Sequence, residues 1–124
     1  MDTPESLAAD MLKAAAEAVV ATRAVVQVGA FNIKRDAKEN VLKSAPIHNA
    51  GAAAAITYDT SIGKTTVDAE IGYDKDKKPG RIGNLLEFGG GKDHSPPHRD
   101  LGRALDAEEP RFTEALAALV EKLL

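Results

Sequence analysis

The sequence predicts an α+β domain, in which a long N-terminal helix packs on a small antiparallel β-hairpin and short helices precede an amphipathic C-terminal helix. Three observations favour this class. Apolar residues recur at helical spacing through residues 1–44, alternate with polar residues within 52–73, and return to helical spacing near the C-terminus. Helices arranged around one hairpin are typical of an α+β fold.

The 124 residues are enough for one domain, and the C-terminal region 81–124 completes it. Hydrophobic residues make up 44% and charged residues 28%, which excludes wholesale disorder. Aromatic residues are only 4%, and much of the apolar content is alanine, whose side chain buries little surface. We therefore expect a thin core within one chain, and association with further chains.

Charge and composition narrow the function classes. The net charge of −3 gives no basic surface of the kind that sequence-specific nucleic-acid binding requires. The sequence has no cysteine, which excludes disulfides and thiolate metal sites. No continuous apolar run approaches the roughly 20 residues that span a bilayer, and the start MDTPES lacks the basic region of a signal peptide. We therefore expect a soluble protein, made in a cytoplasm and not bound to a membrane.

The long helix is predicted to begin after Thr3 and to run to about Lys43. Thr3 is suited to cap the helix, and Pro4 to occupy its first position. Residues three or four apart form one apolar stripe: Leu7, Met11, Ala14, Ala18, Thr22, Val25, Gly29 and Ile33. The stripe is widened by Leu12, Ala15, Val19, Val26 and Ala30, and it is continued by Ala37 and Val41. Gly29 marks a weak point or a close contact. The remaining chain is too short to cover such a helix along its whole length, so we expect neighbouring subunits to cover part of it.

The hairpin is predicted from two runs of alternating residues. Ile56 and Tyr58 belong to the first run. The second run contains Val67, Ala69, Ile71 and Tyr73. Residues 59–64 contain Asp, Ser and Gly, and they predict a loop of about four to six residues. The apolar face of the hairpin is expected to lie on the long helix.

Three helices are predicted in the C-terminal region. Residues 81–88 fit two helical turns, and a second helix is expected to begin at Pro96 or Pro97 with Ser95 as its cap. Pro110 is expected to interrupt that helix. The third helix carries a regular apolar face to the end of the sequence, formed by Phe112, Leu116, Leu119, Val120 and Leu123.

Three histidines raise the question of a metal or acid-base site. Asp93 and Asp100 lie close to His94 and His98, and His48 is the third. His94 and His98 are four residues apart, but two prolines between them oppose a continuous helix through both. We interpret the histidines as surface or interface residues and predict no metal. A metal-assisted hydrolase that uses Asp93, His94 and His98 is the less favoured alternative.

The glycines at 89–91 do not predict a phosphate-binding loop. Asp93 stands after Lys92, where a P-loop has Ser or Thr, and Glu87 adds negative charge beside the glycines. The serines show no G-x-S-x-G nucleophile motif. The sequence therefore predicts no catalytic residue and no cofactor.

Glu87 is the acid of most interest, because it stands between Leu86 and Phe88 just before the glycines. One interpretation is a helix-end carboxylate that accepts hydrogen bonds from backbone amides of the following loop. The other is an ion pair between subunits, for instance to Arg99 or Arg103. A catalytic role for Glu87 is the least favoured of the three.

The segment LLEFGGGKDHSPPHRDLGRAL, residues 85–105, resembles a motif of the head-tail joining proteins of long-tailed phages. In that family a short helix leads into E-F-G-T or E-F-G-G, followed by a variable loop and P-x-P-F-L-x-P-A-L. The order of a long helix, a break containing A-P, a hairpin, this motif and a C-terminal helix agrees as well. The matching residues are Glu87, Phe88, Gly89, Pro97, Leu101, Ala104 and Leu105, with Gly90 where threonine is common.

The resemblance implies a non-enzymatic virion protein of the phage neck, of the tail-completion or tail-terminator kind, that assembles in the host cytoplasm. It implies a ring, expected to be a hexamer, between the stopper or connector of the head and the tail tube, with DNA passing through the lumen without sequence-specific binding. An acidic chain suits such a channel, because Lys and Arg contacts to phosphate are what retain DNA. The implied interface residues are Glu87, Phe88, Gly89, Gly90, Pro97, Arg99, Leu101, Arg103 and Leu105. The alternative is a small helix-mediated adaptor that forms low-order complexes.

Overall fold

The computed structural model describes residues 3–44, 51–63, 66–74, 76, 83, 86–89 and 97–124. Its main elements are α1 (Pro4–Ser44), β1 (Ile56–Ile62), β2 (Val67–Tyr73) and α4 (Asp100–Leu123). Residues 51–54 and 86–88 are also helical. The predicted α+β class is therefore confirmed. Most of the break at 45–51 and of the Gly-Pro loop at 89–97 falls outside the described residues.

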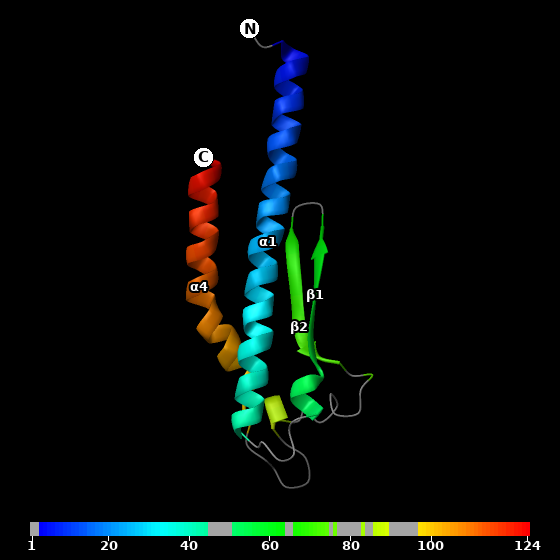
Figure 1. Ribbon diagram of the computed structural model, residues 1–124, viewed down its shortest axis with the longest axis vertical. Coiled ribbons are helices and arrows are strands. Elements are labelled where there is room, and N and C mark those ends of the chain that lie inside the picture. Colours follow the sequence, from blue (N-terminus) through cyan, green and yellow to red (C-terminus); the bar gives the residue numbers. More distant parts are fainter. Residues whose placement is uncertain are drawn as a thin grey trace.

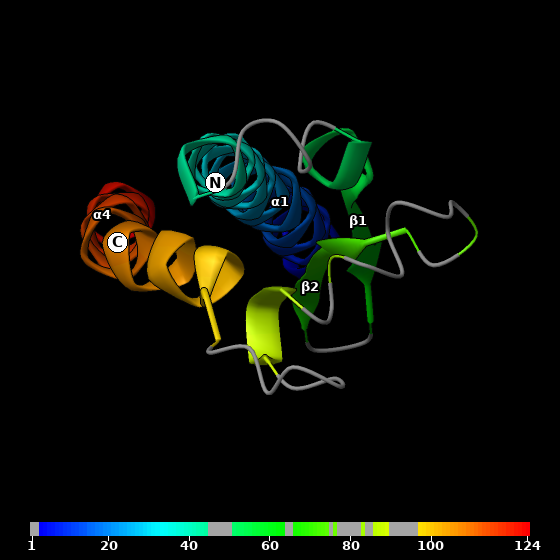
Figure 2. The ribbon, with the colours of Figure 1, turned by 90° about the horizontal axis from the view of Figure 1, so that it is seen from below.

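The long helix α1 is the axis of the molecule (Figure 1). The hairpin and α4 lie on different sides of α1, and α4 runs antiparallel to it (Figures 1 and 2). Both end short of the N-terminus of α1, which extends beyond them. The hairpin and α4 thus leave the first turns of α1 uncovered.

The start of α1 follows the sequence prediction. The Thr3 hydroxyl accepts a hydrogen bond of 3.0 Å from the backbone amide of Ser6, which is the expected N-cap contact. The apolar stripe is buried from Val26 to Val41, but Leu7 and Met11 on the same stripe are 53% and 65% exposed. The hairpin and α4 therefore cover the second half of the stripe and leave its first residues exposed.

By length and composition alone, α1 is long and apolar enough to cross a membrane. This differs from the expectation that no apolar run approaches that length. Between Lys13 and Lys34 the charged residues are Glu17 and Arg23, so isolated charges interrupt an otherwise apolar segment. A mostly buried core helix of a soluble protein and a signal sequence near an N-terminus meet the same criterion, and 17% of this segment is buried in the structure.

The hairpin is an antiparallel two-stranded sheet, with Ile56 opposite Tyr73 and Ile62 opposite Val67. β2 has the predicted extent, but β1 is longer than predicted because it continues to Ile62. The loop begins at Gly63, whose amide donates a hydrogen bond of 2.8 Å to the carbonyl of Thr66. The prediction of a loop from residue 59 was wrong because the turn-forming residue types at 59–61 pair across the strands instead.

The C-terminal helix α4 is continuous through Pro110, so the prediction that Pro110 separates two helices was wrong. A proline within a helix removes one backbone hydrogen bond and bends the helix. Figure 1 shows α4 bent, with its second part running beside α1. Packing on α1 retains the helix across the proline, and α4 begins at Asp100 and not at Pro96 or Pro97.

The core is small, as expected from the composition. Five of the nine residues in its buried cluster are alanine. The cluster consists of Ile33, Ala37, Val41, Ala52, Ala53, Ala55, Ile56, Tyr73 and Ala104. It lies at the C-terminal end of α1, where the hairpin, the helical turn at 51–54 and the start of α4 meet.

Candidate functional site

The carboxylate of Glu87 caps the N-terminus of α4. Its two oxygens accept hydrogen bonds from the backbone amides of Leu101 at 2.8 Å and Gly102 at 2.9 Å. The N-cap residue of α4, Arg99, provides no side-chain cap. Glu87 therefore supplies, from another segment, the acceptor that the first amides of a helix require. The positive end of the helix dipole favours a carboxylate at this position.

The backbone strengthens this contact. The amide of His98 donates to the carbonyl of Leu86 at 2.8 Å, and the amide of Arg99 donates to the carbonyl of Glu87 at 3.2 Å. Four hydrogen bonds thus join residues 86–87 to residues 98–102, and we call this unit the Glu87 clasp. The clasp holds together the two halves of the E-F-G motif and fixes both ends of the segment between them.

Within the chain, the Glu87 carboxylate binds backbone amides and not an arginine side chain. The residue is 6% exposed, and both of its oxygens are occupied by backbone amides. This agrees with the interpretation as a helix-end carboxylate, although the amides belong to the next helix and not to the loop. The guanidinium groups of Arg99 and Arg103 lie instead near Asp106 and Asp100, at 3.7 Å and 2.7 Å.

The other predicted interface residues divide by exposure. Phe88 and Leu105 are 77% and 54% exposed, and Pro97 is exposed as well. Leu101 instead packs against the buried cluster. Gly89 has a φ of 74°, a conformation that glycine adopts without strain. Gly90 lies outside the described residues.

Asp100 and Tyr73 are two buried residues with polar side chains whose burial was not predicted from the sequence. Asp100 is fully buried, and its Oδ1 accepts a hydrogen bond from Arg103. Neither Asp100 Oδ2 nor the Tyr73 hydroxyl has a hydrogen-bond partner among the described residues. Burial, with the nearby charges of Asp100 and Glu87, raises the pKa of Tyr73 well above its ordinary value. Position 83 must be glycine, because the Tyr73 ring occupies the place of its Cβ.

A polar seam joins α1 to α4. Asn32 donates to Glu108 at 3.0 Å, Asp36 accepts from Arg111 at 2.8 Å, and Asn40 donates to the carbonyl of Asp100 at 3.1 Å. The α1 residues are four apart, so they lie on one face of the helix. That spacing is visible in the sequence, but it does not identify α4 as the partner of this face.

Asp36 is the charged centre of the seam. Burial opposes its ionisation, but hydrogen bonds from Arg111 and Arg35 outweigh burial and lower its pKa. In turn the hydrogen bond to Asp36 raises the pKa of Arg111. Asp36 and Arg111 thus form a charged contact between α1 and α4.

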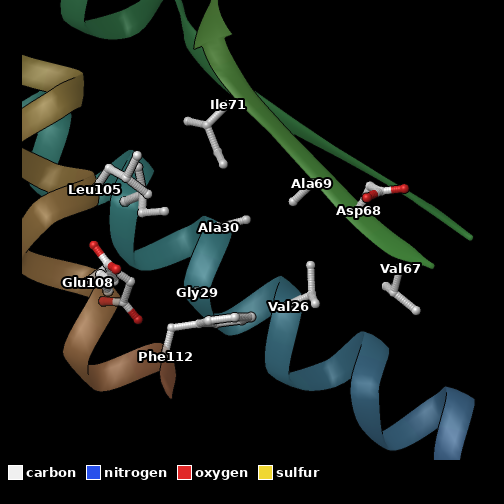
Figure 3. A pocket seen from close by; sticks show the side chains of 12 residues that line it. Val26, Gly29, Ala30, Val67, Asp68, Ala69, Ile71, Leu105, Glu108 and Phe112 are labelled. Atoms are coloured by element: carbon white, nitrogen blue, oxygen red, sulfur yellow. The ribbon is translucent and has the colours of Figure 1, made fainter. Parts of the chain in front are cut away.

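An apolar groove opens between α4 and β2, with α1 as its floor. It encloses a cavity of about 290 Å³. Figure 3 shows Ala30 and Val26 on the floor, Ile71 on the strand side and Leu105 and Phe112 on the side of α4. Gly29 also lies at the floor, and a Cβ there would meet the Phe112 ring at 3.0 Å, as expected for a close contact. The groove is lined largely by apolar side chains.

Within the described residues, no group of three or more His, Cys, Asp or Glu side chains could hold a metal ion. His98 is partly exposed and its Nδ1 lies 3.9 Å from Asp100 Oδ2. The other members of the histidine hypothesis, His94 and Asp93, and the third histidine, His48, lie outside the described residues. No protein-family model, no curated protein and no solved structure matches the chain.

Proposed function

We propose that the chain is a structural protein of the neck of a long-tailed phage, where it joins the head connector to the tail as an oligomeric ring. The Glu87 clasp carries the proposal, because the two parts of the resembling motif meet there through four hydrogen bonds. The acid of E-F-G binds the first amides of the helix that contains R-A-L. This contact gives a physical reason for the two parts to occur together in one motif.

The uncovered part of α1 supports an oligomer. Leu7, Met11 and Leu12 are more than half exposed, although the same stripe is buried further along the helix. Exposed apolar surface of this extent favours association with another chain. The small alanine-rich core also gives one chain little burial of its own.

The proposed mechanism is geometric and not catalytic. α1 and the hairpin build the subunit, and the Glu87 clasp fixes the ends of a loop that would contact the neighbouring neck or tail proteins. The net charge of −3 suits a lumen through which DNA slides without being retained. In this role the protein needs no cofactor.

Sedimentation velocity tests the proposal. The purified chain is measured alone and mixed with tail-tube and connector proteins of the proposed phage. We expect a ring-sized species that contains the tail-tube or connector protein. A chain that assembles with no neck or tail component contradicts the proposal, and a stoichiometric low-order complex with another protein favours the helix-mediated adaptor.

A further inference from the structure

We propose that the apolar groove between α4 and β2 receives the outer face of α1 from a second copy of this chain. The outer face is defined here by Val28, Phe31, Lys34, Arg35, Lys38 and Leu42. The contact would join copies head to tail. This inference rests on the proposed ring and names the interface that would build it.

The groove has the shape and character of a docking surface for a helix. Its walls come from different elements, with Ile71 on β2 and Leu105 and Phe112 on α4 (Figure 3). Leu105 is 54% exposed, although it faces an apolar cavity. Further apolar hollows continue along α1 in both directions, near Val19 at the hairpin loop and near Leu101 at the start of α4. The docking surface therefore extends along the helix axis.

Among the described residues, the charged side chains that line the groove are acidic: Asp68, Glu108 and Glu109. Asp68 alternates with Val67 and Ala69 along β2, so its carboxylate points away from the cavity (Figure 3), and it accepts a hydrogen bond of 2.9 Å from Thr66. Glu108 is paired with Arg111 at 3.1 Å and accepts a hydrogen bond from Asn32, whereas no ion pair within the described part of the chain involves Glu109. An occupant that is apolar and basic therefore fits the groove better than an acidic one.

The outer face of α1 has this complementary character. Phe31 is 51% exposed, Leu42 is 42% exposed and Val28 is 60% exposed. The shallow hollow on this face is also lined by Lys34, Arg35 and Lys38, against one acid, Glu39. Arg35 is paired with Asp36 at 3.2 Å, and the Lys34 ammonium lies 5.6 Å from the centre of the Tyr58 ring. The face combines apolar side chains at helical spacing with an excess of positive charge.

The two surfaces lie on opposite sides of the same helix. Phe31 is five residues from Val26 of the groove floor, and Val28 is two residues from Ala30. At about 100° per residue, both pairs are separated by roughly 140° to 160° around the axis. A contact between unlike faces on opposite sides cannot close as a two-fold dimer, and it repeats from copy to copy into a ring or a filament.

Cysteine cross-linking tests the contact, and the chain has no native cysteine to interfere. Phe31→Cys places a thiol on the outer face, and Leu105→Cys places one in the groove. We expect oxidation of an equal mixture to give a covalent dimer of the two variants. The double variant is expected to give a ladder of larger products.

The matched control is Phe31→Cys combined with Ala118→Cys. Ala118 is exposed and lies thirteen residues from Leu105, which places it on the other side of α4. This pair is expected to give no ladder. Circular dichroism of each variant establishes that the fold is retained before cross-linking is compared.

Charge reversal provides a second measurement. Glu109→Lys reverses the charge of the groove acid that has no ion pair within the described residues, and it is expected to raise the concentration for half-assembly by up to about fivefold.

The experiments distinguish a failure of the groove contact from a failure of the proposed ring. An assembled ring in which Phe31→Cys cross-links to itself, or in which the ladder is absent, overturns the groove contact and leaves the proposed function standing. A chain that stays monomeric at every concentration, with and without neck and tail proteins, overturns both.

Discussion

The carboxylate of Glu87 accepts a hydrogen bond of 2.8 Å from the backbone amide of Leu101, fourteen residues further along the chain. A second bond to Gly102 uses the other oxygen. Hydrogen bonds to a buried charged group are stronger than neutral ones, and an unpaired first turn of a helix loses stability. The contact therefore makes Glu87 a residue that holds α4 in place.

Glu87→Ala is expected to lower the free energy of unfolding by about 2–4 kcal/mol, because two charge-assisted bonds and a cap are lost. Glu87→Gln keeps one acceptor oxygen, so its free energy of unfolding should lie between those of the natural protein and Glu87→Ala. Urea unfolding followed by circular dichroism measures both. Glu114→Ala, on the exposed surface of α4, is the control and should change stability by less than about 0.5 kcal/mol. A Glu87→Ala variant as stable as that control would show that the cap is not needed.

Gly89 tests the turn beside the clasp. Its φ of 74° lies in the left-handed region, so a β-branched side chain is strained there. We expect Gly89→Val to cost about 1–2 kcal/mol and to impair ring assembly, whereas Gly89→Asn should cost less. Thermal unfolding and sedimentation measure the two effects, and equal behaviour of the two variants would contradict the role of backbone conformation.

Gly29 and Phe112 are expected to be energetically coupled. Gly29→Ala in a helix gains about 1 kcal/mol from helix propensity, but its Cβ would meet the Phe112 ring at 3.0 Å. In the natural chain the contact with Phe112 should offset this gain in stability. When Phe112 is replaced by alanine, Gly29→Ala should stabilise the protein. A double-mutant cycle should give a coupling above about 0.5 kcal/mol. Additive effects would show that the ring moves aside without cost.

Tyr73 should make the protein less stable at alkaline pH. Burial raises the pKa of its hydroxyl in the folded state above the ordinary value of 10.0. Above about pH 10 the unfolded chain releases this proton more readily than the folded chain. The contribution of Tyr73 to the free energy of unfolding therefore falls as pH rises. Tyr73→Phe should remove that part of the loss and leave stability at pH 7 unchanged or higher, because the hydroxyl has no partner among the described residues. Urea unfolding at pH 7 and at pH 10–11 compares the natural protein with Tyr73→Phe. An equal loss of unfolding free energy between the two pH values in both proteins would contradict this role.

Local patterns predicted the elements whose signals lie close together in sequence. Thr3 and Pro4 marked the start of α1, and the alternation of Val67, Ala69 and Ile71 marked β2. The alanine-rich composition also predicted the small core. These features depend on periodicity and capping, which are written in neighbouring residues.

Contacts between distant segments could not be predicted in this way. Pro110 was expected to end a helix, but packing on α1 retains it. The pairing of Asp36 with Arg111, and of Glu87 with the α4 amides, depends on how α1 and α4 meet in space. A helical spacing can place residues on one face, but it does not identify the partner of that face.

We propose that copies of this chain form a closed ring at the junction of head and tail. Electron microscopy of the chain mixed with the tail-tube protein, together with native mass spectrometry, would reveal such a ring. We predict rings with a central channel that contain about six copies of the 13.1 kDa chain and bind one end of the tail tube. A monomer or a closed dimer that leaves the tail tube unoccupied would contradict it.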